Sequence, residues 1–84
     1  MQIVRYRYMP TPIAMPSNSN VIGVGMENNE ITLFVEQQQS DSLINRKFIV
    51  AEIGSEITPN SNLIGILQNA STFLFVFEVF NADA

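Results

Sequence analysis

Residues 62–80 constrain the fold most strongly, because they predict two strands joined by the short polar turn Asn69-Ala70-Ser71. In the second strand, alternate positions place Phe73, Phe75, Phe77 and Val79 on one face and Leu74, Val76 and Phe80 on the other. A strand that is apolar on both faces has to be covered on both faces. We therefore expect it to be the central strand of a sheet and to form an oligomer interface through Phe73, Phe75, Phe77 and Phe80.

The preceding residues predict further strands. Alternating apolar and polar side chains mark residues 2–8, 21–27, 30–36 and 46–53, and Asn28-Asn29 indicates a tight turn. Ile13–Met15, between prolines, predicts a short edge segment. The sequence therefore predicts one all-β domain over residues 1–84. We expect a small antiparallel meander of five or six strands that closes as a barrel or a two-layer sandwich, with little helix.

Several local features carry their own expectations. Gly23 and Gly25 lie on one face of their strand, where a backbone or a bulky side chain can approach closely. Residues 37–45 form the longest polar stretch and predict a loop. Residues 55–58 could close a single helical turn, and residues 81–84 are expected to fray.

The composition excludes several chemistries. The chain has no cysteine and no histidine, which excludes disulfides, zinc sites built on these residues, thiol nucleophiles and Ser-His pairs. The sequence contains no phosphate-loop or calcium-loop motif, and Gly23-Val24-Gly25 lacks the rest of a dinucleotide fingerprint. We therefore predict a protein that is not an enzyme, with no catalytic residue, no metal and no cofactor.

The net charge of −4 disfavours binding to a nucleic acid polymer. No apolar run approaches the about 20 residues of a membrane span, and no secretory leader pattern follows Met1. We therefore expect no nucleic acid polymer and no membrane among the partners.

The four cations are not scattered but form the pairs Arg5/Arg7 and Arg46/Lys47. Arginine binds phosphate through two parallel hydrogen bonds, and aromatic rings stack on bases. We predict phosphate binding by Arg5, Arg7, Arg46 and Lys47 and stacking by Tyr6 or Tyr8, where copies of the chain meet. In the competing interpretation, the cations keep the protein soluble and prevent strand edges from pairing with other chains, and the tyrosines are core residues.

Glu78 interrupts the most apolar strand. A buried carboxylate needs a cationic partner. We therefore expect Glu78 either to reach solvent at the strand end or to pair with Arg5, Arg7 or Arg46.

Over nearly its whole length, the chain resembles an uncharacterised family of short proteins from tailed phages and prophages. The resemblance rests on Tyr6-Arg7-Tyr8, on residues 21–29 with Leu33-Phe34-Val35, on Arg46-Lys47-Phe48 with Gly54, and on the hairpin from Ile64-Gly65 through Gln68 to Phe80. Members of that family usually carry tryptophan in the first and third strands and histidine at the position of Glu78. This chain has neither, so no role of that histidine carries over.

The resemblance implies a phage or prophage origin and the host cytoplasm as the setting. Small oligomeric phage proteins of this size resemble two functional types. One is a sponge that sequesters a small, often cyclic, nucleotide immune signal and so blocks host anti-phage defence, and this is the function we expect. The other is a protein–protein inhibitor of a host or defence enzyme, acting through an acidic surface (Glu27, Glu30, Glu36) and a free strand edge. A minor phage structural or assembly protein is a third alternative.

Overall fold

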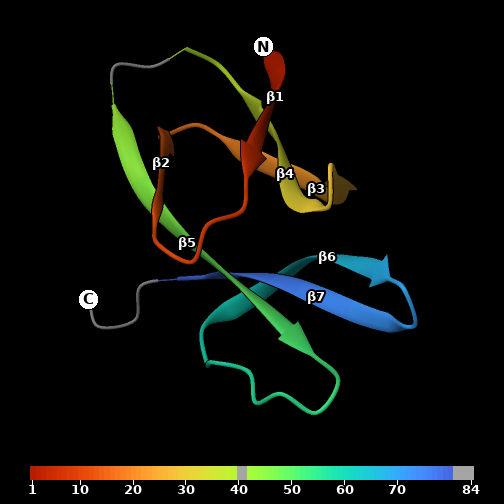
Figure 1. The fold of residues 1–84 in the computed structure, drawn as a ribbon. Helices are drawn as coiled ribbons and strands as arrows, with labels where there is room; N and C mark the ends of the chain where they lie inside the picture. The colour runs from red at the N-terminus through yellow and green to blue at the C-terminus, as the bar shows by residue number, and fades with distance from the viewer. Residues whose placement is uncertain (40–41, 81–84) are drawn as a thin grey trace.

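The computed structural model describes residues 1–39 and 42–80, which form seven strands in two sheets (Figure 1). The strands are β1 (Gln2–Arg7), β2 (Ile13–Pro16), β3 (Asn20–Glu27), β4 (Glu30–Gln37), β5 (Leu43–Glu52), β6 (Ser61–Asn69) and β7 (Thr72–Val79). One sheet has the order β1-β4-β3 and the other β2-β5-β7-β6, and every pairing is antiparallel. The predicted all-β class is confirmed, with a sandwich-like arrangement rather than a closed barrel.

Tight turns join the two strands of each predicted hairpin. Asn28 and Asn29 adopt positive φ angles of 51° and 63° between β3 and β4, a conformation that asparagine tolerates better than most residues. Ala70, with a φ of 56°, lies in the turn between β6 and β7. The strand order nevertheless departs from a simple meander, because β1 pairs with β4, β2 with β5, and β5 with β7.

Two local expectations were wrong. Residues 37–45 are not one loop, because β4 extends to Gln37 and β5 already begins at Leu43. Strand β2 supplies the reason, since Pro16 and Met15 pair with Leu43 and Ile44. Residues 55–58 do not form a helical turn. The expected fraying of residues 81–84 lies outside the described residues.

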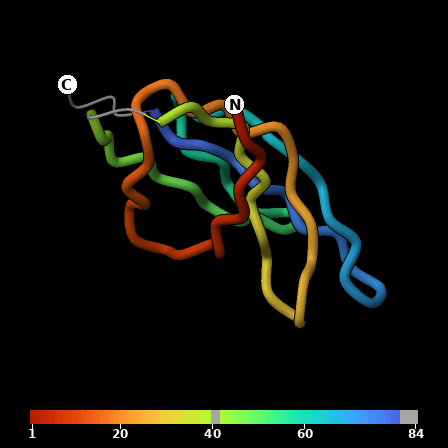
Figure 2. The backbone as a smooth tube through the Cα atoms, turned by 90° about the horizontal axis from the view of Figure 1, so that it is seen from above, coloured from red at the N-terminus to blue at the C-terminus, as the bar shows by residue number. Residues whose placement is uncertain are grey.

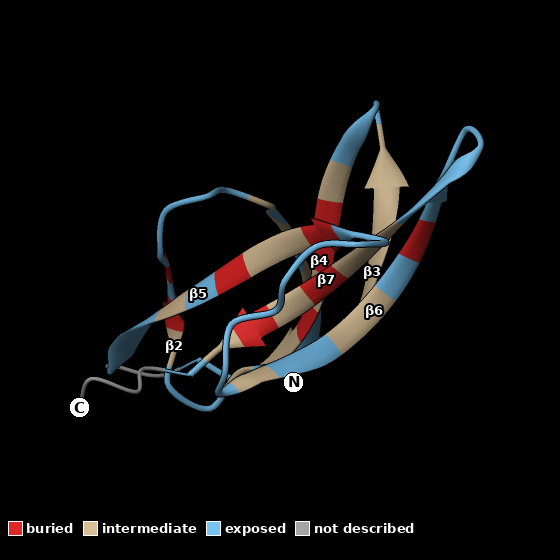
Figure 3. Cartoon of the chain, turned by 90° about the horizontal axis from the view of Figure 1, so that it is seen from below, coloured by how far each residue is buried: buried red, intermediate tan, exposed pale blue. Residues whose placement is uncertain are grey.

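The core lies between the two sheets, and strand β7 runs between β5 and β6, which confirms its predicted central position. The core side chains that are fully buried are Met15, Leu33, Val35, Phe48 and Val76. On the outer face of the second sheet, the connection over residues 53–60 crosses in front of β7 (Figure 3). Ala51 is buried on that side, and Phe75 and Phe77 are half-buried.

Glycines allow close packing at two places. A Cβ atom on Gly25 would lie 2.9 Å from Cε2 of Phe34, which confirms that a bulky side chain covers this position. The second place is where β3 and β6 run alongside each other and join the two sheets (Figure 2). There a Cβ atom on Gly65 would collide with a methyl group of Val24. By contrast, Gly23 has no atom near its Cβ position.

We predict that Gly65→Ala lowers the free energy of unfolding by about 1–3 kcal/mol, because overpacking forces the neighbouring side chain or backbone to move. Gly23→Ala is the matched control, since its added methyl group meets nothing within 4 Å. Urea unfolding followed by circular dichroism measures both. Equal stability of the two variants would show that β3 and β6 do not pack as closely as described.

Candidate functional site

The pocket of interest arises from a stagger in the second sheet. β2 pairs with residues 43–46 of β5, whereas β7 pairs with residues 47–52 on the opposite edge. Because β7 ends at Val79, the first part of β5 has no neighbour on that side among the described residues. A pocket of about 780 Å³ occupies this region. Its lining is Pro12, Ser17, Ser19, Ile44, Asn45, Arg46, Lys47, Thr58, Pro59, Glu78, Val79 and Phe80.

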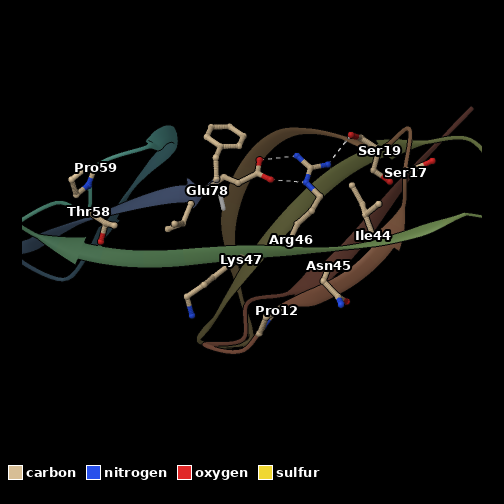
Figure 4. Close-up of a pocket in the computed structure, with 12 residues that line it drawn as sticks. Pro12, Ser17, Ser19, Ile44, Asn45, Arg46, Lys47, Thr58, Pro59 and Glu78 are labelled. Carbon is tan, nitrogen blue, oxygen red and sulfur yellow. Dashed lines mark hydrogen bonds and ion pairs between the residues drawn. The ribbon is translucent and has the colours of Figure 1, made fainter. Parts of the chain in front are cut away.

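A buried ion pair forms one wall of the pocket (Figure 4). Arg46 donates from Nε to Oε2 of Glu78 at 2.6 Å and from Nη2 to Oε1 at 2.7 Å. Its Nη1 donates to the carbonyl oxygen of Ser19 at 2.8 Å. The two side chains are only 16% and 9% exposed. The predicted pairing of Glu78 with an arginine is therefore confirmed, and Arg46 is the partner.

This geometry makes Arg46 a structural residue of the pocket wall. Two parallel charge-assisted hydrogen bonds are the strongest arrangement that a guanidinium and a carboxylate can adopt. All three nitrogens of the guanidinium are engaged, and both oxygens of Glu78 accept a hydrogen bond. A phosphate group would have to displace Glu78 to form the same two parallel hydrogen bonds with Arg46.

Lys47 lies on the other side of β5 from Arg46 (Figure 4). It is exposed, and its Nζ donates to the carbonyl oxygen of Pro10 at 3.1 Å. Within the described residues, it is the one cationic side chain that has no carboxylate partner. An ammonium group has three donors, so two remain available to a bound molecule.

The hydroxyl of Ser19 is the second polar group with unused hydrogen-bonding capacity. Its Oγ is buried, and no hydrogen-bond partner for it exists in the described part of the chain. A buried hydroxyl in that state costs about 1–3 kcal/mol relative to a satisfied one. Ser19 lines the pocket, and a polar atom of a bound molecule would satisfy this hydroxyl only if binding uncovered Oγ.

Arg5 and Arg7 are outside the pocket lining and lie on the outer face of the first sheet. Arg5 is 2.9 Å from Glu27, and Arg7 is 3.4 Å from Glu30. Both arginine side chains are largely exposed, at 72% and 68%. Within one chain, the four predicted phosphate ligands are thus divided among three places: the outer face of the first sheet, the buried ion pair and the exposed Lys47.

The predicted stacking residues face the core. Tyr6 and Tyr8 are half-buried and pack against the core cluster. The hydroxyl of Tyr6 donates to Oε1 of Gln37 at 2.8 Å. This placement matches the competing interpretation, in which the tyrosines are core residues, and it leaves their rings outside the pocket lining.

The predicted interface residues are divided between two sites. Phe73, Phe75 and Phe77 share the outer face of β7, as their alternation predicts, and Phe73 is 44% exposed. Phe80 follows β7, is 51% exposed, and lines the pocket. One pocket thus contains an exposed aromatic ring and an ammonium group without a carboxylate partner, an arrangement that the sequence pattern did not predict.

Sequence reasoning missed the pocket residues of the connections, namely Pro12, Ser17, Ser19, Thr58 and Pro59. They follow no periodic pattern and match no motif, so they carried no signal. In the part of the chain that the structure describes, no group of three metal-binding side chains is assembled. Across the same residues, no helix is long and apolar enough to cross a membrane.

No family model, curated protein or solved structure matches this chain. The site is therefore interpreted from its own geometry.

We predict that Arg46→Ala lowers the free energy of unfolding by about 3–5 kcal/mol, because it leaves the buried carboxylate of Glu78 without a counter-charge. The double variant Arg46→Met/Glu78→Leu, which removes both charges, should recover most of that loss. Arg5→Ala is the control at an exposed ion pair and should cost less than about 1 kcal/mol. Chemical denaturation measures all three, and equal losses for Arg46→Ala and Arg5→Ala would contradict the buried-pair assignment.

Proposed function

We propose that this chain is a non-enzymatic binding protein that holds a small phosphorylated nucleotide in the pocket beside β2, β5 and β7. One observation carries the proposal: the pocket combines an ammonium group without a carboxylate partner, a buried hydroxyl without a partner and an exposed aromatic ring. These belong to Lys47, Ser19 and Phe80. The volume of about 780 Å³ is within the about 300–1,000 Å³ typical of small-molecule sites.

The charge of the lining supports an anionic ligand. Arg46 and Glu78 neutralise each other, so the three charged residues of the pocket leave a net charge of +1 from Lys47 (+2 − 1). The whole chain has a net charge of −4. An anion would therefore be attracted to this pocket and repelled by most of the remaining surface.

The separation of the polar groups supports a ligand with two distant parts. Ser19 and Lys47 lie on opposite sides of β5 (Figure 4). A molecule that contacts both has to extend around the free edge of this strand. A nucleotide meets that requirement, because its phosphate can bind the ammonium group while its base stacks on Phe80 or bonds to the hydroxyl of Ser19.

The same geometry supports binding without catalysis. Glu78, the carboxylate of the pocket, accepts hydrogen bonds from Arg46 on both oxygens. It is therefore poorly placed to take a proton from a bound molecule, which a general base has to do. Together with the resemblance to phage proteins, this supports a sponge that withdraws a nucleotide immune signal in the host cytoplasm and so blocks anti-phage defence.

The first test is calorimetric titration with a panel of linear and cyclic nucleotides. We expect one class to bind, and Lys47→Gln to weaken its binding about 10- to 100-fold, as the loss of a charge-assisted hydrogen bond predicts. Arg5→Gln removes the same charge from the outer face of the first sheet and should leave the affinity unchanged. Equal losses in both variants would indicate a non-specific charge effect, and no binding to any nucleotide would turn attention to a host protein as the partner.

Ser19→Ala separates ligand binding from folding. Because Oγ of Ser19 has no partner in the described residues, its removal should leave the free energy of unfolding unchanged or slightly raised. The affinity for the nucleotide should fall by about tenfold, the usual effect of one lost neutral hydrogen bond. A destabilised variant that retained full affinity would exclude this hydroxyl from the site.

A further inference from the structure

The four sheet edges differ in how they are protected against pairing with another chain. The first sheet ends at β1 and β3 and the second at β2 and β6, and β3 and β6 run alongside each other. Exposed charges, prolines and short length are the usual devices that prevent edge pairing. β1 carries Arg5 and Arg7, β2 has four residues and ends with Pro16, and β3 ends with Glu27.

β6 lacks these devices. Its nine residues, Ser61–Asn69, include no charged side chain and no proline. In a chain with a net charge of −4, such a strand is a place where two copies can meet without bringing like charges together. A register shift at Leu63–Gly65 bends one end of β6, but its pairing with β7 is regular from Gly65 to Asn69.

The exposed apolar surface of the second sheet gathers beside this edge. On the outer face, Phe75 and Phe77 are half-buried, whereas Leu63 and Ile66 of β6 are 46% and 53% exposed. Phe73, which lies opposite Gln68 of β6, is 44% exposed. In Figure 3 the outer side of β6 is drawn largely in the exposed colour. The free edge and the exposed apolar face are therefore continuous.

We propose that β6 pairs with β6 of a second copy of this chain, antiparallel and around a two-fold axis near Ile66. Identical strands that pair antiparallel produce this symmetry without further adjustment, and residues that lie opposite each other share a face. The two Ile66 side chains then cover each other on the outer face, and each sheet continues into the next. This inference does not depend on the nucleotide proposal, because Ile66 is not in the pocket lining.

A second copy fits this edge better than a charged peptide does. A peptide recognised through its charges needs complementary charges along the strand, and β6 offers none. With the axis at Ile66, Gln68 and Asn69 lie opposite Ile64 and Leu63 of the second copy, so that no charged group enters the contact. A small domain buries a limited share of its surface, and association adds to that burial.

Light scattering coupled to size exclusion tests the proposal, with far-UV circular dichroism to verify folding. We expect the wild-type chain at twice its mass of 9.4 kDa, and Ile66→Lys at the monomer mass, because it places like charges opposite each other. The matched control is Ile3→Lys, at a residue of β1 that is 66% exposed; this variant should remain dimeric. A monomeric wild-type chain, or a dimer that Ile66→Lys leaves intact, would overturn the proposal.

A second variant keeps the test valid if Ile66→Lys fails to fold. The chain contains no cysteine, so Ile66→Cys introduces a single thiol. Residues directly opposite each other in an antiparallel pair have Cβ atoms about 4.5–5.5 Å apart, close to the separation that a disulfide spans. We expect mild oxidation to link Ile66→Cys into a covalent dimer and to leave Ile3→Cys unlinked. A dimer that does not become linked would show that the copies meet elsewhere, such as face to face through Phe73.

Discussion

The ion pair between Arg46 and Glu78 is the contact on which the second sheet depends. β7 is apolar on both faces, and Glu78 is its one charged residue. In the observed register, Phe48 lies opposite Glu78, and Arg46, two residues away on the same face of β5, reaches the carboxylate diagonally. A slip of one residue would turn Glu78 to the outer face and Phe75 and Phe77 to the inner face, and it would leave Arg46 buried without a partner. The ion pair therefore makes other registers of β5 and β7 less stable than the observed one.

The same pair connects the register to the pocket. Arg46 also binds the carbonyl oxygen of Ser19, which holds the connection between β2 and β3 against the second sheet. Since β7 ends one residue after Glu78, the first part of β5 is left open at this point. The ion pair closes the bottom of that opening, and both of its charges are satisfied there. A bound anion would then interact with Lys47 at the rim, with no competition from the carboxylate.

The sequence predicted what depends on periodicity and on local chain geometry. It identified β7 as central, the turn at Asn28-Asn29 and the close packing at Gly25, and it gave an arginine partner as one of two alternatives for Glu78. Alternation along the predicted strand already places Arg46 and Lys47 on opposite faces. The sequence could not show that Arg46 is buried against Glu78, since this depends on which strand pairs with each half of β5. Nor could it find Ser19, whose place in the pocket comes from a connection without a repeating pattern.

The two sheets differ in how their charged side chains are paired. On the first sheet, Arg5 and Arg7 are matched by Glu27 and Glu30, so that its outer face is polar and nearly neutral. On the second sheet, the one matched pair is buried, which leaves Lys47 as an exposed cation and β6 as an uncharged edge. The paired charges on the outer face of the first sheet are sufficient to keep that face solvated. Among the described residues, the second sheet presents the groups whose interactions are incomplete in a single chain, and it is therefore the sheet to which we assign the proposed ligand and partner.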